Sequence, residues 1–341
     1  MKLNNVNNIE PLGFQWKARD PFLFCVHHED YFPKGNENLG PESSSLKGRQ
    51  IGQDFTIKDG WRMYHGKKVP GFPSHPHRGF ETVTVVRKGF VDHSDSLKAS
   101  GRYGHGDVQW MTAGRGIQHS EMFPLIHQDK ENTMELFQIW LNLPAKNKMV
   151  EPHFKMLWAE SIPNYTNTDE AGKKTIIEVI SGQVNHQKAP EPPPDSWASN
   201  PENEVAIWDI QMEAGAGWKL PKASAGINRT LYFYKGDQLN ISDTIIKSYH
   251  MAYLTPNAEL TLTAGEKPCG ILILQGKPIN EPVVQYGPFV MNTSQEIQDT
   301  FEEFQRTEFG GWPWSTSEPT HGTNKGRFAQ HADGQLETRE Q

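Results

Sequence analysis

Hydrophobic and β-branched residues occur along this chain in short runs, and turn-forming residues lie between the runs. The runs show almost no helical periodicity, and they are rich in β-branched and aromatic side chains. The runs that we predict to be strands are Phe80–Arg87, Asp107–Met111, Met134–Leu143, Lys174–Ile180, Val205–Met212, Thr230–Tyr234, Tyr249–Leu254, Glu259–Ala264 and Gly270–Gln275. Many short strands separated by Gly, Pro, Asn or Asp are typical of sandwiches and barrels. The predicted fold class is therefore all-β.

One segment near the C-terminus has the pattern of an amphipathic helix instead. Thr293 and Glu296 have the spacing of a capping box. The apolar residues Ile297, Phe301 and Phe304 then recur at i, i+4 and i+7. A Gly-Gly pair ends the pattern, as is common at the C-terminus of a helix. We therefore predict a C-terminal α-helix within residues 291–314 that packs on the β-structure.

Three segments lack both the strand and the helix period. Residues 36–53 are polar, contain Gly and Ser, and are expected to form a loop or insertion. The stretch EPPPDSW, within residues 182–204, holds three consecutive prolines, which would remove three donors from a sheet. We expect an extended surface loop there. Residues 315–341 carry few bulky apolar side chains and are expected to form a flexible polar tail.

The length of the chain, 341 residues, leaves room for two domains that each bury a core. A strand-like run ends at Pro144, and polar residues follow up to Val150. We expect a first domain over residues 1–145, a second over 150–290, the helix over 291–314 and the tail over 315–341. The two successive sets of strands are similar in length, which permits two related barrels.

Composition and charge exclude several classes of function. The 34 basic and 41 acidic residues give a net charge of −7, and basic residues form no long run, so we expect no direct binding of nucleic acid. No apolar stretch approaches the ~20 residues that cross a bilayer, and the first residues lack a secretory apolar core. Cys25 and Cys269 are too few for a disulfide framework. We expect a cytoplasmic protein without membrane contact, or a nuclear one in a eukaryote.

Two pairs of potential metal ligands have the spacing of residues on one face of a strand. His75 and His77 are separated by one residue and lead into a β-branched run, and His119 and Glu121 repeat this spacing further along. Because side chains alternate across a strand, each pair shares a face. If the two strands are neighbours, three imidazoles and one carboxylate converge, which is a sufficient ligand set for a divalent metal.

A structural role is the alternative for each of these residues. A single histidine in a strand is more often a hydrogen-bonded structural residue than a ligand. The set is harder to explain in this way, because four buried titratable groups without a metal would be costly. We therefore predict one metal site at His75, His77, His119 and Glu121.

The stretches around these residues resemble the pirin family of the bicupin superfamily. The resemblance rests on HPHRGFETVTVV and GDVQWMTAGRGIQHSEM, and on the distal YGPFVMN and FGGW, and it covers residues 15–314. It implies two cupin domains, that is, two double-stranded β-helix (jelly-roll) barrels in one chain, with a single metal in the N-terminal barrel. It also implies that the metal is generally iron and that His75, His77, His119 and Glu121 are its ligands.

The general cupin pattern makes Glu81 a competing candidate, because it follows the second histidine by four residues. In pirin-like sequences Glu121 takes that role, and we expect Glu81 to be a supporting or structural carboxylate. His93, His105 and His127 stand alone in loop-like contexts. Since the second domain shows no paired histidines, we expect it to lack a metal and to be structural or to contact a partner.

The resemblance implies two alternative functions. The first is an iron dioxygenase that opens flavonols such as quercetin with dioxygen, in which Glu121 takes the hydroxyl proton of the substrate. Phe72, Met111 and Ile117 flank the ligands and would line an apolar pocket for its flat aromatic substrate, unless they are ordinary core. The alternative is an iron- or redox-dependent transcriptional coregulator that binds a protein partner. Fe(II) is the expected metal, the same ligands would accept Zn, Cu, Ni, Mn or Co, and we expect a monomer.

Overall fold

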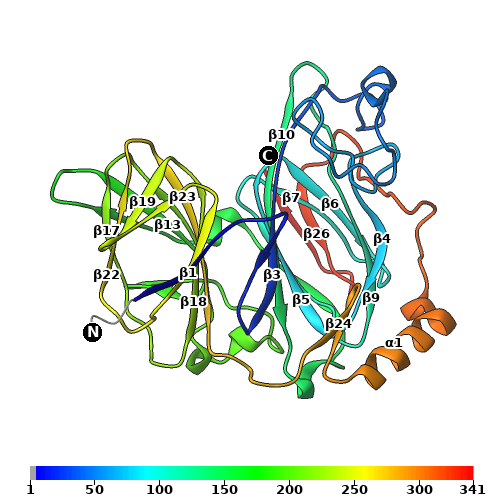
Figure 1. The fold of residues 1–341 in the computed structure, drawn as a ribbon. Helices are drawn as coiled ribbons and strands as arrows, with labels where there is room; N and C mark the ends of the chain where they lie inside the picture. The colour runs from blue at the N-terminus through cyan, green and yellow to red at the C-terminus, as the bar shows by residue number, and fades with distance from the viewer. Residues whose placement is uncertain (1–4, 341) are drawn as a thin grey trace. The chain divides into compact units, whose positions relative to one another are not determined.

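The computed structural model describes residues 5–340, and within them the chain forms two compact units that interleave along the sequence. Unit 1 comprises residues 5–26, 140–142 and 160–280, and unit 2 comprises residues 27–139, 143–159 and 281–340. The order of the elements along the chain can be followed by colour in Figure 1. These units differ from the expected ranges 1–145 and 150–290, because the N-terminal segment belongs with the second set of strands and the C-terminal segment with the first.

Unit 1 contains a seven-stranded sheet in the order β1-β21-β18-β23-β16-β13-β12 and a four-stranded sheet in the order β17-β22-β19-β20. Its strands are β1 (Val6–Pro11), β2 (Gln15–Lys17), β12 (Asn164–Thr168), β13 (Lys174–Ser181), β14 (Gln183–Val184), β15 (Gln187–Lys188), β16 (Ala206–Met212), β17 (Gly217–Leu220), β18 (Asn228–Lys235), β19 (Gln238–Ile241), β20 (Thr244–Lys247), β21 (His250–Leu254), β22 (Leu260–Ala264) and β23 (Cys269–Gly276). Alternate residues of both sheets form one apolar core, which includes Trp208, Leu231 and Ile273.

The structure has a second pair of sheets, which lies mostly in unit 2, and each sheet of this pair has six strands. Their orders are β11-β8-β5-β10-β3-β2 and β27-β26-β7-β6-β9-β4. The strands not yet given are β3 (Phe22–Phe32), β4 (Gly71–His77), β5 (Phe80–Lys88), β6 (Phe90–Asp95), β7 (Ser100–Gly104), β8 (Val108–Thr112), β9 (Ile117–Met122), β10 (Asn132–Asn142), β11 (His153–Leu157), β24 (Val284–Tyr286), β25 (Phe289–Met291), β26 (Arg327–Gln330) and β27 (Leu336–Arg339). The all-β prediction is confirmed.

The predicted helix is also confirmed, as α1 (Ser294–Thr307). Thr293 accepts a hydrogen bond from the backbone of Glu296, whose side chain bonds back to the backbone N–H of Thr293, so the capping box is complete. The apolar face of α1 packs with Phe289 and Met291 of β25. Short 3-10 helices are η1 (Ser43–Leu46), η2 (Ala145–Asn147), η3 (Ala159–Ser161), η4 (Trp197–Ser199), η5 (Pro201–Asn203) and η6 (Glu308–Gly310). Within residues 5–340, no helix combines the length and the apolar character needed to span a membrane.

The expectation of a flexible tail over 315–341 is wrong for most of this segment. Strand β26 pairs with β7 and with β27, so the end of the chain adds a hairpin to a sheet of unit 2. Phe328 is buried, and Arg102 donates hydrogen bonds to the carbonyl oxygens of Gly322 (2.7 Å) and Lys325 (2.8 Å). Backbone pairing at a sheet edge needs few apolar side chains, which is why the polar composition was misleading.

Candidate metal centre

Strands β4 and β9 bring the predicted ligands together. They pair antiparallel with His75 opposite His119, and His77 lies two residues further along β4. Strand β4 is the edge strand of its sheet, which explains how it can include Pro73 and Pro76, since proline cannot donate to a ladder.

Three histidines form a compact cluster at this point. One ring nitrogen from each of His75, His77 and His119 can be chosen so that the three atoms lie within 4.8 Å of one another. The ring of His75 lies 4.5 Å from that of His119 and 4.8 Å from that of His77, measured between ring centroids. Among the described residues, no other group of three or more His, Cys, Asp or Glu side chains brings its ligand atoms so close together. The spacing of this cluster is suited to a single ion.

The environment keeps these imidazoles neutral, which is the form that binds a metal. Burial lowers the pKa of His75 to about 4 and lowers the pKa values of His77 and His119 well below the ordinary range. The Nδ1 atom of His75 lies 2.8 Å from the carbonyl oxygen of Pro73, and that of His77 lies 3.4 Å from the oxygen of Pro288. If each Nδ1–H donates to its carbonyl, Nε2 carries the lone pair.

Both ring nitrogens of His119 are buried and have no hydrogen-bond partner among the described residues. A buried polar atom without a partner is costly. A metal ion held between the three imidazoles would give His119 a partner. The residues present therefore fit a divalent cation on the evidence of this structure.

Glu121, the fourth predicted ligand, lies beside the cluster but outside it. Its Oε2 atom is 3.8 Å from Nε2 of His119, and the group of mutually close ligand atoms does not include it. Gln138 donates a hydrogen bond of 3.2 Å to the carboxylate, and the hydroxyl of Thr84 lies 3.1 Å from it. Burial raises the pKa of Glu121, while His93 and these hydrogen bonds act in the opposite direction. Its role as a ligand remains a prediction.

His93 is a neighbour of the cluster that the sequence did not single out. It lies in β6 and not in a loop, it is fully buried, and it faces Glu121 across the β6–β9 pair. Its ring lies 5.6 Å from that of His119, and its Nε2 lies 3.1 Å from a carboxylate oxygen of Asp95. The segment FVDHSD has two apolar residues followed by four polar ones, so alternation gave no signal for the strand that carries His93.

Glu81 and the three candidate pocket residues take different places. Glu81 is buried in β5 and accepts a hydrogen bond of 2.7 Å from Thr112, and it does not belong to the histidine cluster. Met111 and Ile117 are fully buried members of the core of unit 2. Phe72 packs against the same core but is only half-buried. Of the three, only Phe72 exposes an aromatic surface next to a predicted ligand.

Phe72 is the centre of a group of aromatic rings. The centroid of its ring lies 6.3 Å from that of His75, 5.2 Å from that of Tyr64, 5.9 Å from that of His65 and 6.4 Å from that of Phe55. Phe55 is half-buried and His65 is exposed, whereas Tyr64 is fully buried. The segment before β4 therefore supplies aromatic side chains beside the histidine cluster.

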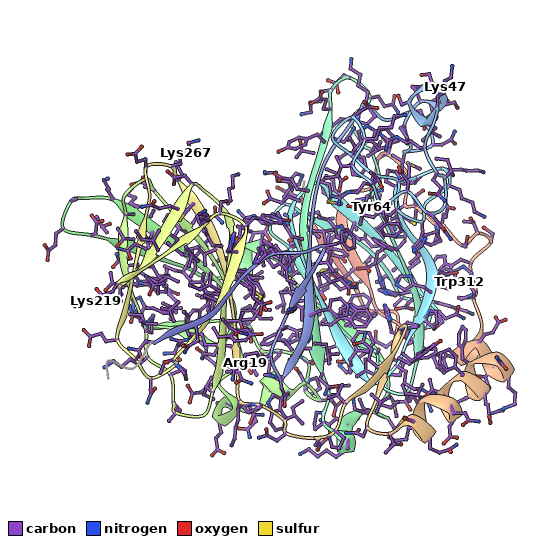
Figure 2. The ribbon with its side chains drawn as sticks, viewed as in Figure 1. Arg19, Lys47, Tyr64, Lys219, Lys267 and Trp312 are labelled. Carbon is purple, nitrogen blue, oxygen red and sulfur yellow. The ribbon has the colours of Figure 1, made fainter. Side chains whose placement is uncertain are left out.

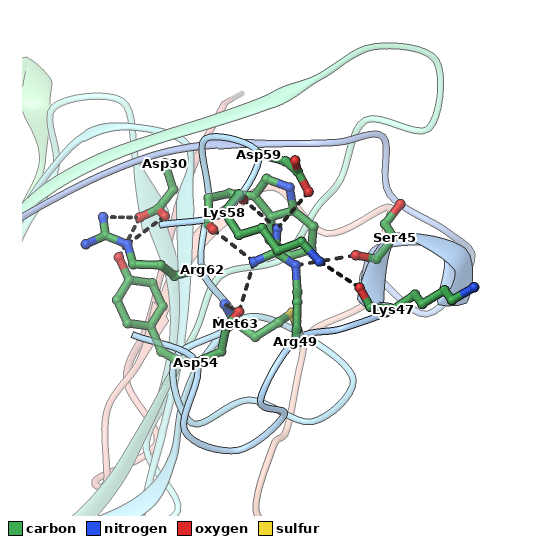
Figure 3. A network of polar contacts seen from close by, with 11 residues as sticks. Asp30, Ser45, Lys47, Arg49, Asp54, Lys58, Asp59, Arg62 and Met63 are labelled. Carbon is green, nitrogen blue, oxygen red and sulfur yellow. Dashed lines mark hydrogen bonds and ion pairs between the residues drawn. The ribbon is translucent and has the colours of Figure 1, made fainter. Parts of the chain in front are cut away.

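A network of polar contacts connects the residues of this segment (Figure 3). The guanidinium of Arg49 lies over the ring of Trp61 and donates to Asp54 (3.0 Å) and to the carbonyl oxygen of Lys58 (2.6 Å). The side chain of Tyr64 is directed into the interior, whereas Lys47 lies at the outer edge of the loop (Figure 2). The segment 36–53 is a loop, as expected, that includes the short helix η1, and Arg49 connects it to a packed layer with Trp61.

Comparison with known proteins identifies the family. The model of the family described as "Pirin" matches residues 10–141, and that described as "Pirin C-terminal cupin domain" matches residues 207–310. Proteins named "Putative quercetin 2,3-dioxygenase" from Pseudomonas aeruginosa and Vibrio cholerae are 36% and 38% identical to this chain, over 70% and 71% of its length and 79% and 80% of theirs. A crystal structure of quercetin 2,3-dioxygenase from Acinetobacter baumannii has a TM-score of 0.67 and 27% identity, and covers 90% of this chain and 96% of that one. The two barrels are thus cupin domains, and this chain belongs to the pirin family.

Proposed function

We propose that this chain is a metal-dependent dioxygenase that opens the central ring of flavonols such as quercetin. The observation that carries the proposal is the buried cluster of His75, His77 and His119, because neutral imidazoles suit iron and other transition metals. The names of the bacterial relatives and of the structural neighbour support the same reaction class. Neither the residues described here nor the comparisons offer an observation in favour of a coregulator, so we do not propose that alternative.

The three histidines and Glu121 would hold the metal, for which we propose Fe(II). When bound, the metal would supply a Lewis acid and a redox centre for the reaction with dioxygen. Glu121 would accept the proton of the flavonol hydroxyl, because it is the carboxylate beside the cluster and its pKa is raised by burial. Gln138 and Thr84 would fix the orientation of this carboxylate through their contacts with it.

The aromatic residues beside His75 would position the substrate. Phe72 and Phe55 are half-buried, so each leaves part of a ring available to pack against a flat polycyclic molecule. The packed layer that contains Arg49 and Trp61 would keep Phe55 in place before substrate arrives. Such preorganisation reduces the entropy cost of binding.

The test of this proposal is turnover by the protein reconstituted with Fe(II). Oxygen consumption and the loss of flavonol absorbance should both be observed with quercetin. In His119→Ala both should fall at least about a hundredfold, because an essential ligand is missing. The matched control is His127→Ala, since His127 lies outside the cluster, and its rates should stay within about twofold of the wild type.

The metal content and the circular dichroism spectrum of each variant separate loss of the site from loss of the fold. The absence of turnover with any of Fe, Mn, Co, Ni, Cu or Zn in a folded, metal-loaded protein would refute the proposal. Unchanged turnover in His119→Ala would do the same.

A further inference from the structure

Unit 1 contains a cavity of about 310 Å³ that no part of the proposed reaction uses. The proline-rich segment forms one side of it, through Pro190 and Pro192, and β16 and β18 form another, through Trp208 and Arg229. The segment is partly ordered by the hairpin β14–β15 and by η4 and η5, and is not simply extended as expected. Gln275 of β23 lies between Ala206 and Arg229 in the sheet, because it is paired with both of these residues.

Arg229 is a buried cation in the wall of this cavity. Arg229 is 1% exposed, and among the described residues it forms no ion pair, although the charge of Glu204, in the same cavity, acts on it. Its Nε donates to Oε1 of Gln275 (2.6 Å), and its Nη1 makes a long contact of 3.4 Å with the carbonyl oxygen of Pro256. Its Nη2 has no hydrogen-bond partner. A buried guanidinium of this kind is unusual, because the free energy lost when a charge is removed from water exceeds what its contacts recover unless it forms an ion pair.

A second donor without a partner lies in the same wall. The indole Nε1 of Trp208 is buried and has no acceptor among the residues that the structure describes. The guanidinium carbon of Arg229 lies 6.0 Å from the centroid of the Trp208 ring. Arg229 and Trp208 thus both line the cavity, and neither Nη2 of Arg229 nor Nε1 of Trp208 has an acceptor among the described residues.

We propose that this cavity binds a small organic carboxylate that carries an apolar group. A carboxylate has the two acceptor oxygens that the free donors of Arg229 and Trp208 lack. Val205, Ala206 and Ala189 also line the cavity and would contact the apolar part of the ligand. The site is in the cupin domain for which the sequence predicted no metal, and it is independent of the proposed dioxygenase activity.

The charges around the cavity favour a monoanion over a phosphate. Arg229 is the cation that lies buried in the wall, and burial lowers its pKa only to about 10, so it is charged at neutral pH. Lys188 and Lys222 also line the cavity but pair with Glu191 (2.7 Å) and Glu259 (3.5 Å). Glu204 also lines the cavity, and its charge acts on Arg229 without forming an ion pair, so the cavity has little excess positive charge. A monoanionic carboxylate fits this balance better than a phosphate dianion, which would remain partly unpaired.

Titration of the full-length protein with acetate, benzoate and inorganic phosphate tests the proposal. Benzoate should bind saturably and more tightly than acetate, and at about ten times its Kd it should raise the melting temperature by roughly 3–5 °C. Arg229→Gln should weaken benzoate binding at least about tenfold, and Trp208→Phe about three- to tenfold. The matched control is Lys222→Gln, at the cavity but already paired, which should change the Kd by less than about twofold.

A spectroscopic measurement on the wild type keeps the test valid if Arg229→Gln does not fold. In a ¹⁵N–¹H correlation spectrum, the indole signal that disappears in Trp208→Phe should move downfield as benzoate is added. The proposal is wrong if no probe binds saturably, if this indole signal does not respond, or if folded Arg229→Gln binds benzoate as the wild type does. Tighter binding of phosphate than of benzoate would overturn the assignment to a carboxylate.

Discussion

Asp30 is a buried carboxylate in the layer that lies beside the candidate metal centre. This carboxylate is fully buried, receives two hydrogen bonds from Arg62 (3.0 and 2.9 Å) and one from the hydroxyl of Tyr64. Burial raises the pKa of Asp30, and Arg62 and Tyr64 act against this effect. The same hydroxyl lies 2.8 Å from Nδ1 of His28. The cluster therefore links β3 to the segment that supplies the aromatic rings beside His75.

Substitution of Arg62 by alanine should be strongly destabilising. It leaves Asp30 buried without its cation, and the expected loss in the free energy of unfolding is about 3–5 kcal/mol. Urea unfolding measures the loss. Lys68→Ala, an exposed position in the same segment, should stay within about 0.5 kcal/mol of the wild type. A loss below about 1 kcal/mol in Arg62→Ala would show that the hydrogen bond from Tyr64 is sufficient for the buried carboxylate of Asp30, or that water reaches it.

At this scale the sequence predicted which candidate ligands share a face of a strand, but not what surrounds them. Alternation along a strand is local geometry, so the spacing of His75 and His77 was sufficient to place both on one face. Their approach to His119 depends on the pairing of β4 with β9, which the sequence analysis had to assume. His93 reaches the same sheet through the pairing of β6 with β9, and the contacts of Glu121 come from β5 and β10. Such long-range pairings have no local signal in a single sequence.

Strands β3, β5 and β10 meet at a second buried carboxylate, that of Glu135. The ammonium of Lys88 lies 2.7 Å from it, and Nε2 of His27 lies 3.5 Å from it. Burial raises the pKa of Glu135, but the hydrogen bonds from His27 and Lys88 and the charge of Arg87 outweigh it, and the pKa falls to about 2. A carboxyl group whose pKa is lower in the folded state stabilises the fold above its unfolded pKa, and this contribution disappears as the pH falls toward 2.

Glu135→Gln should therefore cost stability at neutral pH but not in acid. We expect a loss of about 1–3 kcal/mol at about pH 7, and the difference from the wild type should shrink progressively below about pH 4.5. Urea unfolding of both proteins between about pH 7 and pH 3 measures this difference. The control Glu131→Gln, on an exposed loop, should change stability by less than about 0.5 kcal/mol at pH 7. A difference independent of pH would contradict the assignment.

Elements with a strong local period were predictable, and elements that depend on pairing were not. Strand β5 and helix α1 lie where their patterns placed them, since alternation and a capping box are properties of neighbouring residues. Strand β26 was missed because it is held by the edge of β7, and only Phe328 of its residues is bulky and apolar. The aromatic layer before β4 was missed for a related reason, because Trp61 and Tyr64 are buried without any regular period.

At the scale of the whole chain, the sequence predicted two barrels but not how the chain is shared between them. Strand β1 pairs with β21, so the N-terminal residues belong to unit 1, while β26 pairs with β7 and returns the C-terminal residues to unit 2. A prediction that divides the chain into contiguous domains cannot anticipate such exchanges, because they depend on which edge strand is free to pair. The consequence is that the candidate metal centre lies in unit 2 and the cavity at Arg229 in unit 1.

Metal binding should therefore stabilise unit 2 and not unit 1. A ligand present at about a hundred times its Kd stabilises the folded state by about 2.7 kcal/mol, which corresponds to about a hundredfold slower hydrogen exchange for amides that open with the site. Peptide-resolved exchange, with and without Fe(II) under anaerobic conditions, should show this protection in β4 and β9 and none in β16 and β23. His77→Ala should abolish the difference. The cluster on β4 and β9 is the one close group of three histidines in the described chain, so the ion should protect the unit that contains it. Equal protection of both units in the wild type would mean that the ion binds elsewhere or that the two units open together.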